Sequence, residues 1–216
     1  MTLHTPRPLS PAASSRAGFT LIELLIVIAI LGLLAAVLLP VLIGTKNTAD
    51  EAATDATMLQ LSQACNVFSN KHGFYPPDDL KDPENKLQLK PDNGQNTGIE
   101  SFVVFTSQSM QDGVDLSGLA EHFTNTDKDE NGTAVPLLKT KERRELADAW
   151  KTPFAYFTKF GVNKTQQVTG ANEEPLAAKA KLREDGSWFG TPKFQFLSAG
   201  KDGTFGTSDD RVWPAN

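Results

Sequence analysis

The chain contains very little cysteine and histidine. Cys65 is its one thiol, so no disulfide can form within the chain and a cysteine-ligated zinc site is excluded. The three histidines, His4, His72 and His122, lack the spacing that places two imidazoles on one helix face in zinc hydrolases. We therefore expect a fold that is held together without cross-links.

A clustered basic surface is missing as well. The formal net charge is -5 at pH 7, and because Arg7 and Arg16 precede Gly18, the remainder of the chain is more acidic still. Proteins that bind nucleic acid through its phosphates need a basic face. The sequence also has no nucleophile paired with a base, no phosphate-binding glycine loop and no redox cysteine motif. These features argue against nucleic-acid binding and against enzymatic activity.

The chain does have one long apolar run near its start. Between residues 19 and 43 the strongly polar residues are Thr20 and Glu23. As a helix this run would be about 37 Å long, which is enough to cross the hydrocarbon core of a membrane. Arg7 and Arg16 precede the run and acidic residues dominate after it, so the positive-inside rule places the N-terminus in the cytoplasm. We expect a single-pass membrane protein whose larger domain faces outward.

Small residues precede this run instead of following it. An ordinary secretory signal is cleaved after its apolar segment, whereas here Ala17 and Gly18 come directly before it. The stretch GFTLIELLIVIAIL resembles the cleavage and methylation motif of type IV pilins and type II secretion pseudopilins. The resemblance implies that residues 1–18 are a leader, that prepilin peptidase cuts between Gly18 and Phe19, and that Phe19 is then N-methylated.

Glu23 occupies the position of the acidic residue in that family. Cleavage would create an α-amine at Phe19, four residues before Glu23, and a positive partner would offset the free energy of burying a carboxylate in lipid. The amine of a neighbouring subunit is the alternative partner, and it would fix the stagger between subunits. We interpret Glu23 as an assembly residue; the competing interpretation is a signal anchor whose glutamate reaches water at the membrane surface.

The first helix is predicted to continue beyond the membrane. Residues 44–73 contain apolar residues three and four apart, including Cys65, and Gly73 is the predicted C-terminal stop. We therefore expect an amphipathic continuation of the helix that presents an apolar stripe to a globular domain. Pro40 predicts a kink or an unwound turn between residues 32 and 40.

Residues 74–216 are predicted to form a periplasmic globular domain. Phe74-Tyr75-Pro76 resembles the turn that follows the long helix in major pseudopilins, whereas residues 78–145 match no family motif and are interpreted as an insertion. Alternating aromatic residues predict strands at 154–160 and 193–198. Residues 101–106 fit either a buried strand or a buried helix, residues 116–123 a short helix, and residues 175–183 a short surface helix. The predicted fold class is α+β, with a long N-terminal helix packed on a small antiparallel sheet, as in type IV pilins.

A second stretch, LADAWKTPFAY, resembles the family's Asp-x-Trp-Gly-Asn-Pro segment. Asp148, Trp150 and Pro153 match this pattern. Lys151 and Thr152 replace the glycine and asparagine of the family, and this departure argues against the family's tight turn at this place.

Acidic residues also gather near the C-terminus, in LSAGKDGTFGTSDDRVW. This stretch resembles the calcium-binding loop of major pseudopilins, which implies that Asp202, Asp209 and Asp210 supply carboxylates and that Leu197 and Ser198 lie near the carbonyl ligands. The alternative is a hairpin turn at Asp202 followed by a solvated acidic pair. Calcium would be structural here and not catalytic.

The run TDKDENG imitates the opening of an EF-hand loop. Position twelve, counted from Asp127, is Leu138, so the closing glutamate is missing and a solvated turn is the preferred interpretation.

These observations favour a structural subunit of a type II secretion pseudopilus, anchored in the bacterial inner membrane. Its implied partners are prepilin peptidase, copies of itself, other pseudopilins and the inner-membrane assembly platform. A type IV pilin or minor pilin for adhesion, motility or DNA uptake is the nearest alternative, because it shares the N-terminal signal. Many such pilins close a C-terminal loop with two cysteines, and this chain has one. A membrane-tethered binding module or enzyme is the alternative from another class.

Overall fold

A computed structural model describes residues 18–82, 89–108, 111–161, 163–190 and 193–214. All of the predicted leader except Gly18 lies outside these residues. The chain divides into two compact units, residues 1–45 and residues 46–216. They are treated separately below, and the domain boundaries expected from the sequence remain predictions.

The first element is the long helix α1 (Leu21–His72), which contributes residues to both units. Among the described residues it is the one helix long and apolar enough to cross a membrane. Its helical assignment continues through Pro40, so the predicted unwound turn is absent from the described helix. The helix stops as predicted, because Gly73 adopts a φ of +80° and its N–H donates to the carbonyl of Ser69 (2.8 Å).

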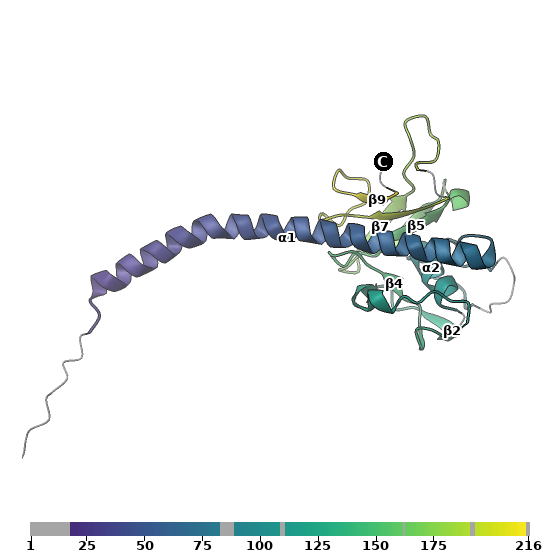
Figure 1. Cartoon of the computed structure of the whole chain (residues 1–216), viewed down its shortest axis with the longest axis horizontal. Helices are drawn as coiled ribbons and strands as arrows, with labels where there is room; N and C mark the ends of the chain where they lie inside the picture. The colour runs from purple at the N-terminus through teal and green to yellow at the C-terminus, as the bar shows by residue number, and fades with distance from the viewer. Residues whose placement is uncertain (1–17, 83–88, 109–110, 162, 191–192, 215–216) are drawn as a thin grey trace, which may run out of the picture. The chain divides into compact units, whose positions relative to one another are not determined.

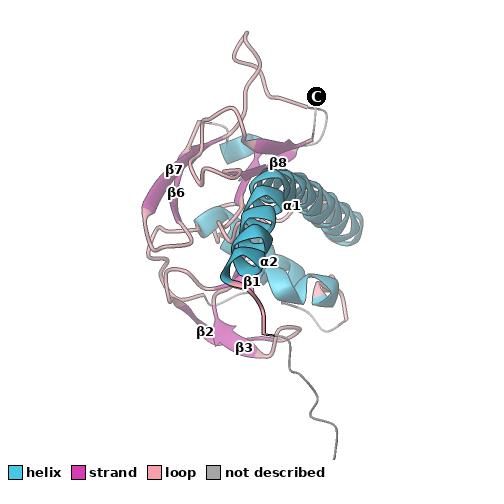
Figure 2. Ribbon diagram, turned by 90° about the vertical axis from the view of Figure 1, so that its left-hand side faces the viewer, coloured by secondary structure: helices cyan, strands magenta, loops and turns pink. Residues whose placement is uncertain are grey.

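The second unit is built around the last turns of α1. Met58, Leu61 and Cys65 of α1 pack against the helix α2 (Thr97–Ser107), and Figures 1 and 2 both show α2 beside this part of α1. The stretch SFVVFT, which periodicity left undecided, is therefore helical. The Cys65 thiol is fully buried, 3.9 Å from the Tyr156 hydroxyl, and burial raises its pKa well above the ordinary value.

A three-stranded antiparallel sheet packs against these helices. Its strands β5 (Ala155–Thr158), β8 (Phe194–Ser198) and β9 (Arg211–Trp213) occur in the order β5-β8-β9. Tyr156 lies opposite Phe196, so the aromatic residues that predicted two of these strands meet in the core. Both strand predictions and the α+β class are confirmed.

A second pair of strands corrects one expectation. Residues 175–183 were expected to form a helix, but β7 (Pro175–Lys179) pairs antiparallel with β6 (Thr165–Thr169). The turn between them is closed because the N–H of Gly170 donates to the carbonyl of Glu174 (2.8 Å). Helix propensity in an alanine-rich stretch is a weak preference, and pairing with a neighbouring strand overrides it here.

The expected insertion contains α2 and two further strand pairs. β1 (Phe123–Thr124) pairs with β4 (Glu145–Leu146), and β2 (Glu130–Val135) pairs with β3 (Thr140–Glu142). Short 3-10 helices, η1 (Ser117–His122) and η2 (Lys159–Gly161), connect other elements, and η1 confirms the short helix expected there. Figure 2 shows the β2–β3 and β6–β7 pairs as separate ribbons.

Candidate functional site

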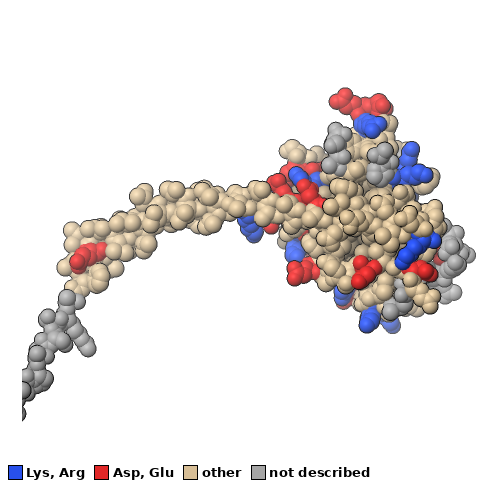
Figure 3. Space-filling model, in the orientation of Figure 1, with Lys and Arg blue, Asp and Glu red and all other residues tan. Residues whose placement is uncertain are grey.

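The surface of α1 in the first unit is apolar throughout. Every large apolar side chain from Phe19 to Leu42 is exposed, with values from 45% for Val27 to 83% for Phe19. Figure 3 shows this part of α1 as an uncharged surface with one acidic patch, and Glu23 is the one charged residue between residues 18 and 45. Such a surface requires cover by lipid or by other apolar helices.

Glu23 and Thr20 form a reciprocal cap at the start of α1. The backbone N–H and the hydroxyl of Thr20 both donate to Glu23 Oε2 (2.8 and 2.7 Å), and the N–H of Glu23 donates to Thr20 Oγ1 (3.3 Å). This is a capping box, in which a threonine precedes the helix and a glutamate follows three residues later. Sequence reasoning missed this role, although the T-x-x-E spacing was its signal.

The residues of the predicted cleavage site lie outside the helix. Gly18 and Phe19 are exposed and precede the first residue of α1. The bond between them thus belongs to a non-helical segment of the chain.

The predicted calcium loop is closed by its own hydrogen bonds. Asp209 Oδ2 accepts from the N–H of Asp202 (3.0 Å), and Asp209 Oδ1 accepts from the Thr207 hydroxyl (2.6 Å), which lowers the pKa of Asp209. Asp210 Oδ2 accepts from the N–H of Gly206 (2.7 Å), and burial raises the pKa of Asp210. Asp210 Oδ1 is buried and has no hydrogen-bond partner among the described residues.

The two predicted carbonyl donors lie in the sheet at the start of this loop. Leu197 pairs with Val212, and Ser198 pairs with Arg211. The hydroxyl of Ser198 donates to Asp148 Oδ2 (2.6 Å), so this side chain is directed to a neighbouring turn.

That turn is the Asp148 segment, and it is tight in spite of its substituted residues. Asp148 Oδ1 accepts from the N–H groups of Trp150 (2.9 Å) and Thr152 (3.0 Å), and burial raises the pKa of Asp148 to about 6. Lys151 adopts a φ of +73°, the left-handed conformation that glycine favours. The turn therefore forms with a lysine in the place of the family's glycine.

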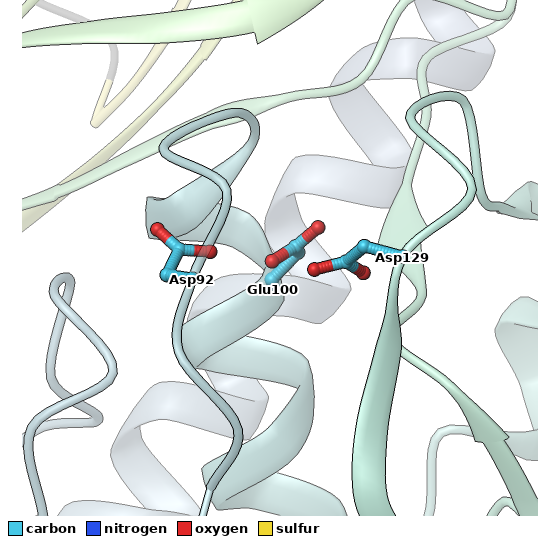
Figure 4. Close-up of side chains that lie close together, drawn as sticks. All are labelled: Asp92, Glu100 and Asp129. Atoms are coloured by element: carbon cyan, nitrogen blue, oxygen red, sulfur yellow. The ribbon is translucent and has the colours of Figure 1, made fainter.

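A cluster of acidic side chains, of which Glu100 and Glu145 are buried, lies between α2 and the two strand pairs of the insertion. We define the acidic cluster as Asp92, Glu100, Asp127, Asp129 and Glu145. Two sets within it, Asp92–Glu100–Asp129 and Glu100–Asp127–Glu145, have carboxylate oxygens that all lie within 4.8 Å of one another. Figure 4 shows Glu100 on α2, between Asp92 and Asp129. The C-terminal loop carboxylates form no such set among the described residues.

The expected solvated turn is wrong for Asp127, Asp129 and Asn131, which belong to this cluster or contact it, whereas Lys128 and Glu130 of the same segment are exposed. The side chain of Asp129 is 13% exposed, and Asn131 is 2% exposed. The fully buried guanidinium of Arg143 contacts both: Nη1 donates to Asp129 Oδ2 (2.7 Å) and Nε donates to Asn131 Oδ1 (3.1 Å). Nη1 also donates to Asp92 Oδ1 (3.0 Å).

Glu100 is the least compensated member of the cluster. It is 0% exposed, and neither of its carboxylate oxygens accepts a hydrogen bond from the part of the chain that the structure describes. Its nearest cationic atom in an ion pair is Arg143 Nε, at 3.8 Å. Burial, followed by the charges of Asp129, Asp127 and Glu145, raises the pKa of Glu100 to about 11.

The N-terminal segment of the chain matches a known protein family model. The family model described as the prokaryotic N-terminal methylation motif matches residues 13–39. The chain carries a type IV pilin-like N-terminus. This confirms the family resemblance based on the stretch that begins at Gly18.

Curated relatives extend the likeness slightly beyond that motif. Type II secretion system core protein G of Klebsiella michiganensis is 36% identical over 62 residues, covering 29% of this chain and 44% of the relative. The core protein G of Vibrio cholerae is 36% identical over 62 residues (29% and 42%), and that of Escherichia coli K12 is 34% identical over 65 residues (30% and 45%). The chain thus matches less than half the length of these relatives. No solved structure matches it significantly.

The chain therefore has two regions of functional interest, the N-terminal segment and the acidic cluster, and the evidence for a function differs between them. Cleavage at Gly18, methylation of Phe19 and the assembly role of Glu23 remain predictions that the family match makes reasonable. The C-terminal calcium loop also remains a prediction. The acidic cluster was missed, although a glutamate within the apolar stretch IESFVVF was a signal of a buried charge.

Proposed function

We propose that this protein is a structural subunit of a type II secretion pseudopilus, which is processed by prepilin peptidase and assembled into a periplasmic filament. The observation that supports this most directly is the exposed apolar surface of α1, which begins at the methylation motif and carries a single carboxylate. The similarity to core protein G favours a pseudopilus over other pilin-like assemblies. The protein is proposed to act by association and to catalyse no reaction.

The apolar surface suits a subunit that exchanges lipid for neighbouring helices. In the inner membrane α1 would be a single-pass anchor, with the N-terminus in the cytoplasm and the second unit in the periplasm. In a filament the same side chains would pack against α1 of other subunits. The expected partners are prepilin peptidase, copies of this chain, other pseudopilins and the inner-membrane assembly platform.

Glu23 would then have two successive partners. In the precursor it caps α1 through Thr20. After cleavage, the new α-amine of Phe19, from the same chain or from a neighbour, provides a cation in a medium where an unpaired carboxylate is unfavourable. Pairing with a neighbour would fix the stagger between subunits.

Calcium is proposed to bind the C-terminal loop through Asp202, Asp209 and Asp210, with backbone carbonyls near Leu197 and Ser198. The unpartnered oxygen of Asp210 supports this assignment, whereas the carboxylates of Asp202 and Asp209 are engaged in loop hydrogen bonds that the ion would have to replace. Asp202→Asn should reduce the calcium-dependent rise in thermal midpoint; an unchanged rise would contradict the assignment.

Replacement of Gly18 tests the proposed function as a whole. In cells, Gly18→Val should leave the leader in place, so that the protein accumulates as an unassembled precursor and export of secreted proteins stops. Gly44→Val is the matched control, since an added side chain at Gly44 meets open space as it does at Gly18, and it should be processed normally. Intact-mass spectrometry should find that the wild-type chain begins at a methylated Phe19.

Deletion of the gene separates the pseudopilus from the type IV pilus. Loss of protein export with motility, adhesion and DNA uptake unchanged is the expected result. Loss of one of those three functions with export intact would instead assign the chain to a type IV pilus.

A further inference from the structure

We propose that Glu100, Asp127 and Glu145 of the acidic cluster bind one calcium ion, at a site separate from the C-terminal loop. This site lies wholly within the expected insertion, residues 78–145, and it is independent of the proposed function.

The spacing of the three carboxylates fits one ion. Each of the three side chains offers one carboxylate oxygen, and these three oxygens lie within 4.8 Å of one another. Oxygens bound to calcium lie about 2.3–2.6 Å from it, so two ligands on opposite sides of the ion are about 4.6–5.2 Å apart. An ion among the three side chains therefore needs little rearrangement of the backbone.

The charges of the cluster are also unbalanced. Three of the five carboxylates, Asp92, Glu100 and Asp129, pair with the single guanidinium of Arg143, and its Nη1 is committed to Asp92 and Asp129. Two lysines that flank the cluster in sequence contact other acids, since Lys90 lies 3.9 Å from Glu130 and Lys128 lies 2.5 Å from Glu173. Among the described residues, the one cation paired with the set Glu100–Asp127–Glu145 is Arg143, whose Nε lies 3.8 Å from Glu100 without a hydrogen bond to it.

Unpartnered oxygens point to a ligand at this set. Both oxygens of the fully buried Glu100 and Oδ1 of Asp127 have no hydrogen-bond partner within the described ranges. A buried carboxylate without donors is strongly unfavourable unless it is neutralised. Meanwhile Asn93 Nδ2 donates to Asp127 Oδ2 (2.9 Å) and Asn96 Nδ2 donates to Glu145 Oε1 (2.7 Å), and these bonds orient two of the three carboxylates.

The donor set selects a hard cation. All three ligands are carboxylates, and neither cysteine nor histidine belongs to the set, which disfavours zinc. Calcium accepts irregular arrangements of six to eight oxygens, whereas magnesium requires nearly octahedral geometry and retains several waters. A set of three carboxylates, two of them buried, therefore suits calcium better. A proton on Glu100 is the competing means of neutralisation.

Binding would join three separate parts of the insertion. Glu100 lies on α2, Asp127 lies in the loop before β2, and Glu145 lies on β4. Because an ion that binds only the folded state stabilises it by mass action, calcium should hold these segments together in a chain that has no disulfide.

Calcium titration of the mature full-length chain tests the site. The protein is purified in a non-ionic detergent, stripped with EGTA, and titrated with CaCl₂ in a calorimeter. Glu100→Gln should lose one equivalent of bound calcium relative to wild type. Glu121→Gln, which changes an exposed glutamate, should lose none. Asp202→Asn in the C-terminal loop should retain the equivalent that Glu100→Gln loses.

Thermal unfolding provides the second measurement. At a calcium concentration about 100 times the dissociation constant, the site should raise the midpoint of wild type by ~5 °C or more, and Glu100→Gln should lack this part of the rise. Asp127→Asn should behave in the same way, which keeps the test decisive if Glu100→Gln does not fold. Hydrogen exchange should slow at residues 97–107 and 123–131 when calcium is added to wild type.

Equal numbers of bound calcium ions in wild type, Glu100→Gln and Asp127→Asn would overturn the proposal. The proton would then be the neutralising group. Equal affinity for magnesium and calcium would overturn the choice of ion.

Discussion

Glu23 and Glu100 are both single charged residues within apolar stretches of sequence, yet their surroundings differ completely. Glu23 lies on an exposed apolar helix surface and is held by Thr20, while Glu100 is enclosed by four other carboxylates and Arg143. The N-terminal part of α1 thus depends on something outside the chain, namely lipid or other subunits. The stability of the second unit depends on contacts within its own interior. Substitutions in the first region should alter assembly, and substitutions in the second should alter stability.

Removal of Arg143 should produce the largest effect on stability. Arg143→Gln leaves several buried carboxylates without their cation, and breaking a buried ion pair in this way costs about 3–5 kcal/mol. Urea unfolding of the purified chain measures the loss. Arg144→Gln is the matched control; its ion pair with Glu142 is partly exposed, so a loss of about 1 kcal/mol or less is expected. Similar losses for the two variants would contradict the contrast between interior and surface charges.

Asp148 should give the second unit a pH dependence. Burial raises its pKa to about 6 in the folded chain, so the folded state binds a proton that the unfolded state has already released. This contribution to stability is complete below about pH 4 and is lost as the pH rises to about 6. Relative to wild type, Asp148→Asn should therefore gain ~2 kcal/mol between pH 4 and pH 7.

Urea unfolding at a series of pH values measures this difference. Asp115→Asn is the control, because hydrogen bonds from Ser117 lower the pKa of the exposed Asp115, so its replacement should not produce a gain with rising pH. A constant difference between wild type and Asp148→Asn across the range would contradict the assignment.

The charge of Glu23 can be separated from its capping role. Gln at the same position preserves a capping box, so Glu23→Gln should leave α1 intact but reduce incorporation into the filament ~10-fold or more in cells that also make wild type. Thr20→Ala removes the cap, at about 1 kcal/mol, and keeps the charge. Near-normal incorporation of Thr20→Ala is expected. If Thr20→Ala were impaired as much as Glu23→Gln, capping and not charge would be the role of Glu23.

Lys151 should give the smallest effect. Because its φ is +73°, Lys151→Gly should relieve backbone strain and stabilise the chain by about 0.5–1 kcal/mol. Lys164→Gly, at a residue without positive φ, should be neutral or destabilising. Thermal unfolding compares the two variants. A loss of stability in Lys151→Gly would show that the contact of Lys151 Nζ with the carbonyl of Glu121 (3.3 Å) outweighs the strain.

The sequence predicts those parts of the fold that depend on neighbouring residues. Gly73 marks the end of α1, and alternating aromatic residues mark β5 and β8, because glycine conformation and strand periodicity are local properties. β7 was mistaken for a helix because its partner strand, and not its alanine content, decides its conformation. The N-terminal signal was equally local, which explains why the family could be recognised from it.

The acidic cluster could not be predicted in the same way. Its members come from α2, from two loops and from β4, and only the packing of the insertion brings them together. The segment that contains Asp127 and Asp129 had the composition of an exposed turn, and its contact with the interior is made by Asp129 with Arg143, a residue outside that segment. Glu100 was the one member of the cluster with a local sequence signal, because it is a charged residue within an apolar stretch.

The reactivity of the Cys65 thiol can report when α1 separates from the core of the second unit. Its thiol lies in the core formed by α1 and the sheet, and its raised pKa keeps it in the unreactive protonated form at neutral pH. A thiol reagent can therefore label it only after α1 separates from Tyr156. Since the chain has no other thiol, the labelling rate would time that separation directly, in a detergent micelle or within an intact fibre, without any engineered probe.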